Sequence, residues 1–285
     1  MKTTTILHDH FGAKGGHQRW WAPIYHHFRL ARHNVLWADD WLETDDIIAR
    51  SGDGPVQVIT WNGSWCERAY ADRATLKAAG IPVLIAEVGW FPQKYHVHLD
   101  TEGINAESSL MRSLPEVESK VQDLNYVKSR YYGSEAHDSP DGHVLVVGQY
   151  EQDTNLITHA PYPTNQEFVF HCAEKFRGIN VTWRPHPRTR EQVRIPDHWK
   201  RVPHDEESIA DAIRSASFVY AQNSTVLLEA ALLGVEAEAI GAGLFKQWSH
   251  CLDHLVAALL LRQIHISAKN IDHALGCLEG QKFQK

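Results

Sequence analysis

Short apolar runs recur along the chain, and most of them are followed by a polar turn and then by a longer stretch with helical spacing. In the first half these runs predict strands over 4–8, 34–37, 56–61 and 82–86, with helices over 17–32 and 67–79. Strands that alternate with helices form βαβ units, so the pattern predicts a parallel sheet that helices cover on both faces. Residues 87–105 mix glycines and a proline with aromatics and histidines, which predicts an irregular loop.

The same rhythm restarts after a polar, turn-rich segment at 131–142, which itself follows helical spacing over 107–130. Strands are predicted over 144–147, 180–183, 218–221 and 237–240, and helices over 165–176, 206–215 and 225–233. The sequence therefore predicts an α/β protein with two Rossmann-like domains that face each other across a cleft, one over 1–142 and one over 143–285.

The composition of the chain is that of an ordinary globular protein. Its 285 residues are 43% hydrophobic and 22% charged, with a net charge of −7, so no overall positive field favours nucleic acid or anionic membrane. No apolar run approaches the roughly 20 residues of a membrane span, and the N-terminus does not resemble a signal peptide. The four cysteines are scattered without a CxxC motif, which indicates reduced thiols and, with the rest, a cytoplasmic protein.

Nineteen histidines raise the alternative of a metal enzyme. His8 with His10, and His96 with His98, have a spacing that puts both rings on one face of a strand. However, no HExxH motif or carboxylate-rich cluster accompanies them, so we expect no bound metal and interpret them as polar site or surface residues.

Two polar turns that follow predicted strands are suited to holding a phosphate. His186 lies between two prolines, which restrict the backbone on both sides, and Arg184 and Arg188 supply positive charge. Ser224 and Thr225 lie where a strand turns into a helix, whose free N–H groups and dipole attract anions. A surface basic turn and a plain helix N-cap are the alternatives.

Carboxylates provide the candidates for chemistry. Asp153 and Glu87 each follow an apolar strand, and a nucleophile or general base for sugar transfer is a carboxylate. Capping of a helix is the alternative for Asp153. Glu229, one helical turn beyond Thr225, is a candidate partner for a ribose or a base, or else a solvated helix residue.

A glycine-rich turn follows the first predicted strand. It has neither the GxxxxGK[ST] spacing of a P-loop nor a GxGxxG fingerprint, so neither an ATPase nor an NAD enzyme is favoured. We expect Gly15, Gly16 and His17 to lie on the acceptor side, where glycines permit close approach of the backbone to a substrate. A tight βα turn is the alternative.

Several of these segments together resemble the capsule-type β-Kdo transferases. The blocks are Val144–Asp153 (VLVVGQYEQD), Arg184–Pro187 (RPHP), and Asn223–Thr225 (NST) followed by Glu229–Gly234 (EAALLG). The His-Pro and Ser/Thr elements are also similar to those of bacterial sialyltransferases. In the first half, Ala86–Phe91 (AEVGWF) and Leu99–Asn105 (LDTEGIN) resemble the E-D-G-F and D-x-x-G-I stretches, although Val88 replaces the aspartate of the first.

This resemblance implies a GT-B glycosyltransferase with the donor nucleotide on the C-terminal domain and the acceptor near the N-terminal one. Asp153 is then the catalytic carboxylate and Glu87 a second acid/base candidate. The predicted donor-binding residues are His186, Arg184, Arg188, Asn223, Ser224, Thr225, Glu229 and Gln149. No metal or other cofactor is expected, because the histidine and the helix N-terminus offset the charge of the leaving phosphate.

The leading hypothesis is transfer of a sugar from a CMP- or UDP-activated donor to a hydroxyl of a glycan. Transfer to a hydroxymethylated pyrimidine base in DNA is an alternative, because basic and aromatic residues interleave at 19–21 and 128–132. A non-catalytic nucleotide- or glycan-binding protein and a metal-dependent hydrolase are the other classes. Donor sugar, acceptor, stereochemical outcome and oligomeric state remain open at this stage.

Overall fold

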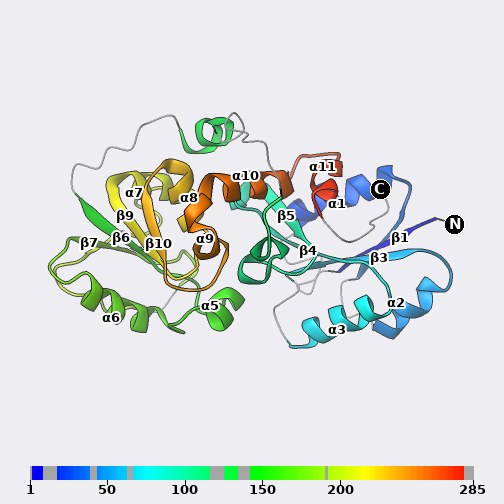
Figure 1. The fold of residues 1–285 in the computed structure, drawn as a ribbon, viewed down its shortest axis with the longest axis horizontal. Helices are drawn as coiled ribbons and strands as arrows, with labels where there is room; N and C mark the ends of the chain where they lie inside the picture. The colour runs from blue at the N-terminus through cyan, green and yellow to red at the C-terminus, as the bar shows by residue number, and fades with distance from the viewer. Residues whose placement is uncertain are drawn as a thin grey trace. The chain divides into compact units, whose positions relative to one another are not determined.

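The computed structural model describes residues 2–8, 18–38, 44–62, 67–115, 125–133, 142–189 and 192–278. The chain divides into two compact units, one of Met1–Pro115 with Ala258–Lys285 and one of Glu116–Ala257. Each unit has a sheet with helices on both faces, as Figure 1 shows. The predicted α/β class with two Rossmann-like halves is confirmed. Among the described residues no helix is long and apolar enough to cross a membrane.

The first unit is built on a six-stranded sheet in the order β11-β5-β4-β3-β1-β2. Its strands are β1 (Thr4–His8), β2 (Asn34–Ala38), β3 (Val56–Trp61), β4 (Val83–Val88), β5 (His96–Asp100) and β11 (Gln263–His265). The first four are parallel, and β5 and β11 are antiparallel to their neighbours. The helices are α1 (Gln18–Leu30), α2 (Thr44–Ser51), α3 (Glu67–Ala78) and α11 (Asp272–Gly276).

Strand β5 corrects the irregular loop predicted over 87–105. It pairs with β4 so that Glu87 lies opposite His98. Its residues alternate polar and apolar, a pattern typical of a strand with one face in water. Here all five residues are buried, so the polar face of β5 is buried as well. The helix expected over 107–130 is not found over residues 107–115, which form the 3₁₀ turns η2 (Asn105–Glu107) and η3 (Ser109–Met111) and an irregular segment to Pro115. Residues 125–127 are helical, as expected, and continue into the π-helical turn η4 (Lys128–Tyr132).

The C-terminal residues belong to the first unit rather than to the predicted second domain over 143–285. Helix α10 (Leu252–Arg262) leads into β11, which completes the sheet beside β5. The side-chain oxygen of Gln263 accepts hydrogen bonds from the backbone N–H groups of Trp90 and Phe91, at 2.6 and 2.8 Å. Ile264 is fully buried in the core of this unit. Strand pairing and core packing therefore place the division after Pro115, and again after Ala257, rather than at the predicted 142/143 boundary.

The second unit has a five-stranded parallel sheet in the order β10-β9-β6-β7-β8. The strands are β6 (His143–Val147), β7 (Val181–Arg184), β8 (Lys200–Arg201), β9 (Ala216–Ala221) and β10 (Glu236–Ala239). The helices are α5 (Thr154–His159), α6 (Asn165–Lys175), α7 (Ile209–Ser215), α8 (Val226–Leu233) and α9 (Leu244–Gln247). Numbered within the unit, the strand order is 3-2-1-4-5, the classical Rossmann order.

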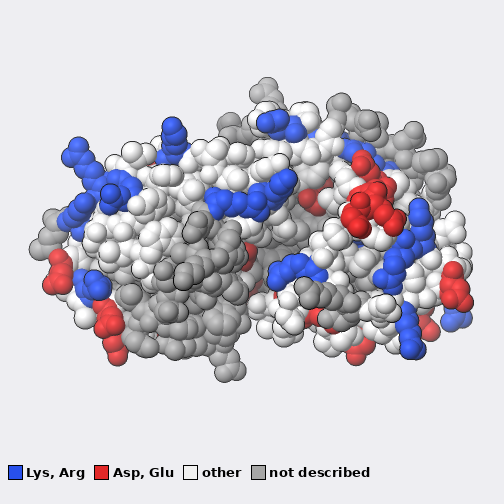
Figure 2. Space-filling model, turned by 180° about the vertical axis from the view of Figure 1, so that it is seen from behind, with Lys and Arg blue, Asp and Glu red and all other residues white. Residues whose placement is uncertain are grey.

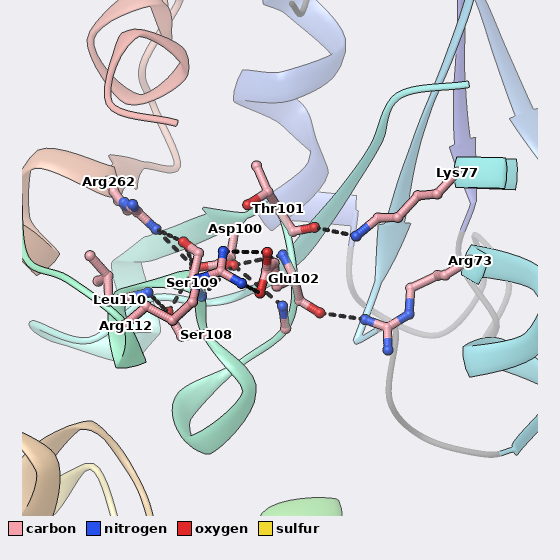
Figure 3. Close-up of polar contacts among 11 residues, drawn as sticks. Arg73, Lys77, Asp100, Thr101, Glu102, Ser108, Ser109, Leu110, Arg112 and Arg262 are labelled. Atoms are coloured by element: carbon pink, nitrogen blue, oxygen red, sulfur yellow. Dashed lines mark hydrogen bonds and ion pairs between the residues drawn. The ribbon is translucent and has the colours of Figure 1, made fainter. Parts of the chain in front are cut away.

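A buried ion pair anchors the segment that follows β5. Asp100 is fully buried, and its carboxylate accepts from Nη1 of Arg262 at 2.9 Å and from the N–H and hydroxyl groups of Ser109 (Figure 3). Beyond it, Lys77 and Arg73 of α3 donate to the backbone carbonyls of Thr101 and Glu102. The last residue of α10 and the edge of the sheet are thus joined through one carboxylate.

We predict that Asp100→Asn destabilises the first unit by about 3–5 kcal/mol, because it leaves the charge of Arg262 buried without its counter-ion. Urea unfolding followed by circular dichroism measures the loss. The matched control is Glu102→Gln, which breaks the solvent-exposed pair with Arg112 and should hardly move the unfolding midpoint. Equal effects of the two substitutions would contradict the anchoring role of Asp100.

Candidate functional site

Three strands of the second unit end level with one another, and their turns carry the residues singled out in the sequence. Val147, the last residue of β6, pairs with Arg184 at the end of β7 and with Ala221 at the end of β9. The turns after β7 and β9 therefore emerge at one edge of one sheet, on either side of the β6 turn. Strand spacing puts about 10 Å between the ends of β7 and β9. His186 and the start of α8 thus share the carboxyl edge, where α/β sheets bind ligands.

His186 presents one nitrogen to the turn and leaves the other open. Its Nδ1 accepts the backbone N–H of Arg188 at 3.1 Å, so the proton of the neutral ring is on Nε2. Burial, and then the charge of Arg188, lower the pKa of His186, whereas Asp153 acts to raise it. Among the described residues Nε2 has no hydrogen-bond partner. The imidazole is therefore a neutral N–H donor at pH 7.

Tyr150 holds the side chains of the β7 turn. The guanidinium of Arg188 lies 4.0 Å from the centre of the Tyr150 ring, within the range of a cation–π contact. The rings of Tyr150 and His186 are 6.1 Å apart and tilted. A residue of the β6 turn thus contacts the two groups of the β7 turn that were predicted to bind phosphate. Sequence reasoning missed Tyr150, since nothing in its local spacing identifies the residues that it meets.

The start of α8 offers several unused donors. The N-cap residue is Thr225, whose side chain makes no capping hydrogen bond; instead Oγ of Ser224 accepts the N–H of Val226 at 3.3 Å, and the Ser224 carbonyl accepts from Leu227. The backbone N–H groups of Ser224 and Thr225 and the Thr225 hydroxyl make no hydrogen bond with any residue that the structure describes. These donors lie at the positive end of a helix, the arrangement that favours an anion.

Asp153, the predicted catalytic carboxylate, caps a helix with one oxygen only. Its Oδ1 accepts the N–H of Asn155 at the start of α5, at 2.9 Å. Its Oδ2 has no donor within the described parts of the chain, and the side chain is half-buried. Capping and a catalytic role are therefore compatible, and the catalytic assignment stays a prediction.

Two of the predicted donor-binding residues are engaged inside the second unit. Arg184 is buried, and its Nη2 donates to the carbonyl of Glu207 at 2.6 Å, before α7. Glu229 is buried, and its Oε1 accepts the hydroxyl of Tyr132 at 2.7 Å. These contacts fix the orientation of both side chains, and their predicted binding of the donor stays a prediction. Neither partner is recognisable from the sequence, because both are distant along the chain. Glu207 lies 23 residues from Arg184, and Tyr132 lies 97 residues from Glu229.

Gln149 and Asn223, also predicted to bind the donor, bond to each other across the turns after β6 and β9, at 2.8 Å. Asn165 at the start of α6 holds the backbone of Gln149 through both atoms of its side-chain amide. Asn165 was missed in the sequence, where it looks like an ordinary residue of a helix start.

The first unit holds the other nominated carboxylate, Glu87, next to the end of β4. Its Oε1 accepts the N–H of Val88 at 2.8 Å. Gly15, Gly16 and His17 lie outside the described residues, so their place on the acceptor side stays a prediction. The two blocks that hold Glu87 and Asp100 are neighbours in the sheet, since β4 and β5 pair.

The histidine pair of β5 is buried. Nδ1 of His96 lies 3.1 Å from the carbonyl of Pro92, and burial lowers the pKa of His96 to about 4. Burial likewise lowers the pKa of His98 to about 4, with Asp100 acting to raise it, and His98 packs edge-on against Trp90. Within the described ranges no three His, Cys, Asp or Glu side chains gather as a metal site would require.

Figure 2 shows how the charges are distributed over one face of the protein. Within each unit, the described Lys and Arg side chains visible in this view form separate groups rather than a continuous basic stripe, and Asp and Glu groups are also visible. A track for a nucleic-acid backbone needs such a stripe.

Comparisons with known proteins agree with the fold. The sequence matches no protein-family model and no curated protein. Among solved structures, the β-Kdo 2,7 transferase of Thermosulfurimonas dismutans KpsC has a TM-score of 0.64, with 16% identity over 95% of each chain. The β-Kdo 2,4 transferase of the same KpsC also has a TM-score of 0.64, with 14% identity over 97% of this chain and 98% of that one. The resemblance predicted from short sequence blocks is thus confirmed at the level of the whole fold.

Glu229 provides a test of the second unit that depends on pH. Burial raises its pKa to about 7, so the stabilisation from the protonated form is complete below about 4.5 and is lost as the pH rises through about 7. Glu229→Gln, which stays neutral and can still accept from Tyr132, should therefore match the wild type near pH 4. At pH 8.5 it should be more stable, by up to about 3 kcal/mol.

Urea unfolding at the two pH values measures this difference. Glu174→Gln, at an exposed helix position, is the control and should follow the wild type at both. A Glu229→Gln variant that is less stable than the wild type at pH 8.5 would contradict this prediction, because it would show that ionisation of the buried carboxylate does not lower the free energy of unfolding.

Proposed function

We propose that this protein is a glycosyltransferase that moves a sugar from a nucleotide-activated donor, a CMP- or UDP-sugar, to a hydroxyl of a glycan. One observation carries the proposal: Nε2–H of His186 and the donors at the start of α8 lie at the same edge of one parallel sheet and have no hydrogen-bond partner among the described residues. The whole-chain likeness to two β-Kdo transferases supports the choice of reaction class.

The donor groups at this edge suit a phosphate that leaves with negative charge. The neutral His186 donates one hydrogen bond, and Ser224 and Thr225 supply N–H and hydroxyl donors at a helix start. Arg188 adds positive charge from the β7 turn and is held against Tyr150. These groups offset the charge that develops on the phosphate oxygen when the bond to the sugar breaks, without a metal ion in the scheme.

Asp153 is the carboxylate assigned to the chemistry. In the transfer, the bond between the anomeric carbon and the phosphate oxygen breaks and its electron pair leaves with the nucleotide. A bond from the acceptor oxygen to the anomeric carbon replaces it, and the acceptor proton passes to a base. Asp153 has an open Oδ2 in the turn after β6, where it serves either as that base or as the nucleophile of a two-step transfer.

Glu87 remains the second acid/base candidate, and the glycan acceptor remains a prediction for the first unit. No observation favours the DNA alternative. The nucleotide sugar acts as co-substrate, and no other cofactor enters the proposal.

Nucleotide binding and turnover together test the function. CMP or UDP at roughly 100 times its dissociation constant should stabilise the protein by about 2.7 kcal/mol, whereas ADP should not. Asp153→Asn should abolish transfer from a matching donor sugar while it keeps this stabilisation. Asparagine is as good an N-cap as aspartate, so the substitution removes the charge and leaves the start of α5 capped.

The outcomes separate the alternatives. A non-catalytic binding protein keeps its full function in the Asp153→Asn variant. If CMP, UDP, GDP and ADP all fail to stabilise the wild type, the donor site at this edge of the sheet is refuted.

A further inference from the structure

Two amide side chains join the turns at the centre of the second sheet. Nε2 of Gln149 donates to Oδ1 of Asn223 at 2.8 Å, and the backbone N–H of Asn223 donates to Oε1 of Gln149 at 3.0 Å. Gln149 is 8% exposed and Asn223 is 6% exposed. We call this pair of hydrogen bonds the amide clasp.

Further hydrogen bonds tie the clasp to both neighbouring helices. Nδ2 of Asn223 donates to the carbonyl of Asn155 in α5 at 2.8 Å. Asn165, which is 1% exposed, accepts from the N–H of Gln149 at 3.0 Å and donates to its carbonyl at 2.8 Å. The functional atoms of the two side chains are therefore already used within the protein. A donor nucleotide would have to break these bonds in order to replace them.

The turn that carries Gln149 is packed tightly against the sheet. A Cβ atom added to Gly148 would lie 2.7 Å from a ring carbon of Trp183 and 3.1 Å from Oδ1 of Asn165. Only glycine lets the backbone pass this close, so the position of Gln149 over the end of β6 is fixed.

The clasp lies where the ladder of the sheet stops. Val147 and Ala221 are the last paired residues of β6 and β9, and beyond them the two turns continue without pairing to each other. Strands β6 and β9 are also the switch point of the strand order, the place where open α/β sheets bind ligands. The amide clasp connects the turns after these two strands through their side chains.

The residues next to the clasp are those to which the proposed function assigns phosphate binding and chemistry. Ser224 follows Asn223 directly. Asp153 caps α5, the helix whose Asn155 carbonyl the side chain of Asn223 holds. Asn223 thus links the start of α8 directly to α5, and its bonds to Gln149 link the start of α8 to the turn that leads from β6 to Asp153.

We propose that Gln149 and Asn223 are positioning residues, which fix the spacing between the phosphate donors at the start of α8 and the carboxylate of Asp153 without touching the donor. This inference rests on the proposed function. It replaces the expectation from the sequence that both side chains contact the nucleotide.

A double-mutant cycle tests the proposal. Affinity for CMP, or for UDP if that nucleotide stabilises the wild type, is measured by calorimetry for Gln149→Ala, Asn223→Ala and the double variant. Each single change removes the same clasp, so each should weaken binding roughly tenfold, and the double variant should be weakened by about the same factor. Asn180→Ala is the control, because this amide side chain is exposed before β7, at the opposite edge of the sheet, and makes no hydrogen bond with a described residue, so the variant should bind like the wild type.

Two results would overturn the proposal. Independent contacts to the nucleotide would multiply, so that the double variant binds about a hundredfold more weakly. A purely structural role would lower the melting temperature of the free protein while affinity per folded molecule stays unchanged. If an alanine variant does not fold, Gln149→Asn, which keeps the amide on a chain too short for the clasp, is judged by the same criteria.

The cycle also distinguishes the failure of this inference from the failure of the proposed function. Wild-type protein that binds none of the nucleotides refutes the function, and the positioning role with it. Wild-type protein that binds a nucleotide, combined with multiplicative losses, refutes the positioning role alone.

Discussion

Parallel pairing of β6 with β7 on one side and β9 on the other is the constraint on which the candidate site depends. Because Val147 lies opposite the last residue of both neighbours, three turns leave the sheet at one level. His186 is 38 residues before Ser224 in the chain, yet this register brings both to one edge. Any shift in the pairing of β7 or β9 would move one of the proposed phosphate-binding groups away from the level of the other.

The polar side chains at this edge fall into two classes according to how many of their polar atoms are already hydrogen-bonded within the protein. Gln149, Asn223 and Glu229 have their functional atoms engaged with other side chains or with the backbone. His186 and Asp153 each use one atom to fix their own orientation, and the second atom has no hydrogen-bond partner in the part of the chain that the structure describes. Engaged groups give the edge its shape, and half-engaged groups are pre-oriented for a ligand. The same distinction marks Asp100 in the first unit as an anchor, since its carboxylate is saturated by Arg262 and Ser109.

Most strands of both sheets and the two phosphate-suited turns could be predicted from the sequence, because short apolar runs and the turn residues after them are local signals. Strand β5 could not, since burial of His96, His98 and Asp100 depends on β11, which comes from the far end of the chain. The roles of individual site residues could not be predicted for a similar reason, because they depend on contacts between residues far apart in the sequence. Gln149 and Asn223 are 74 residues apart, and nothing in the spacing indicates that they bond to each other. Residue type predicted where polar groups gather, but only tertiary contacts show which of them remain open.

The most direct measurement is a crystal structure of the protein with CMP bound. The account predicts a phosphate oxygen about 3 Å from Nε2 of His186 and another phosphate oxygen at a similar distance from the N–H or hydroxyl groups of Ser224 and Thr225. A phosphate held elsewhere, with His186 and the start of α8 both without contact to it, would contradict the account.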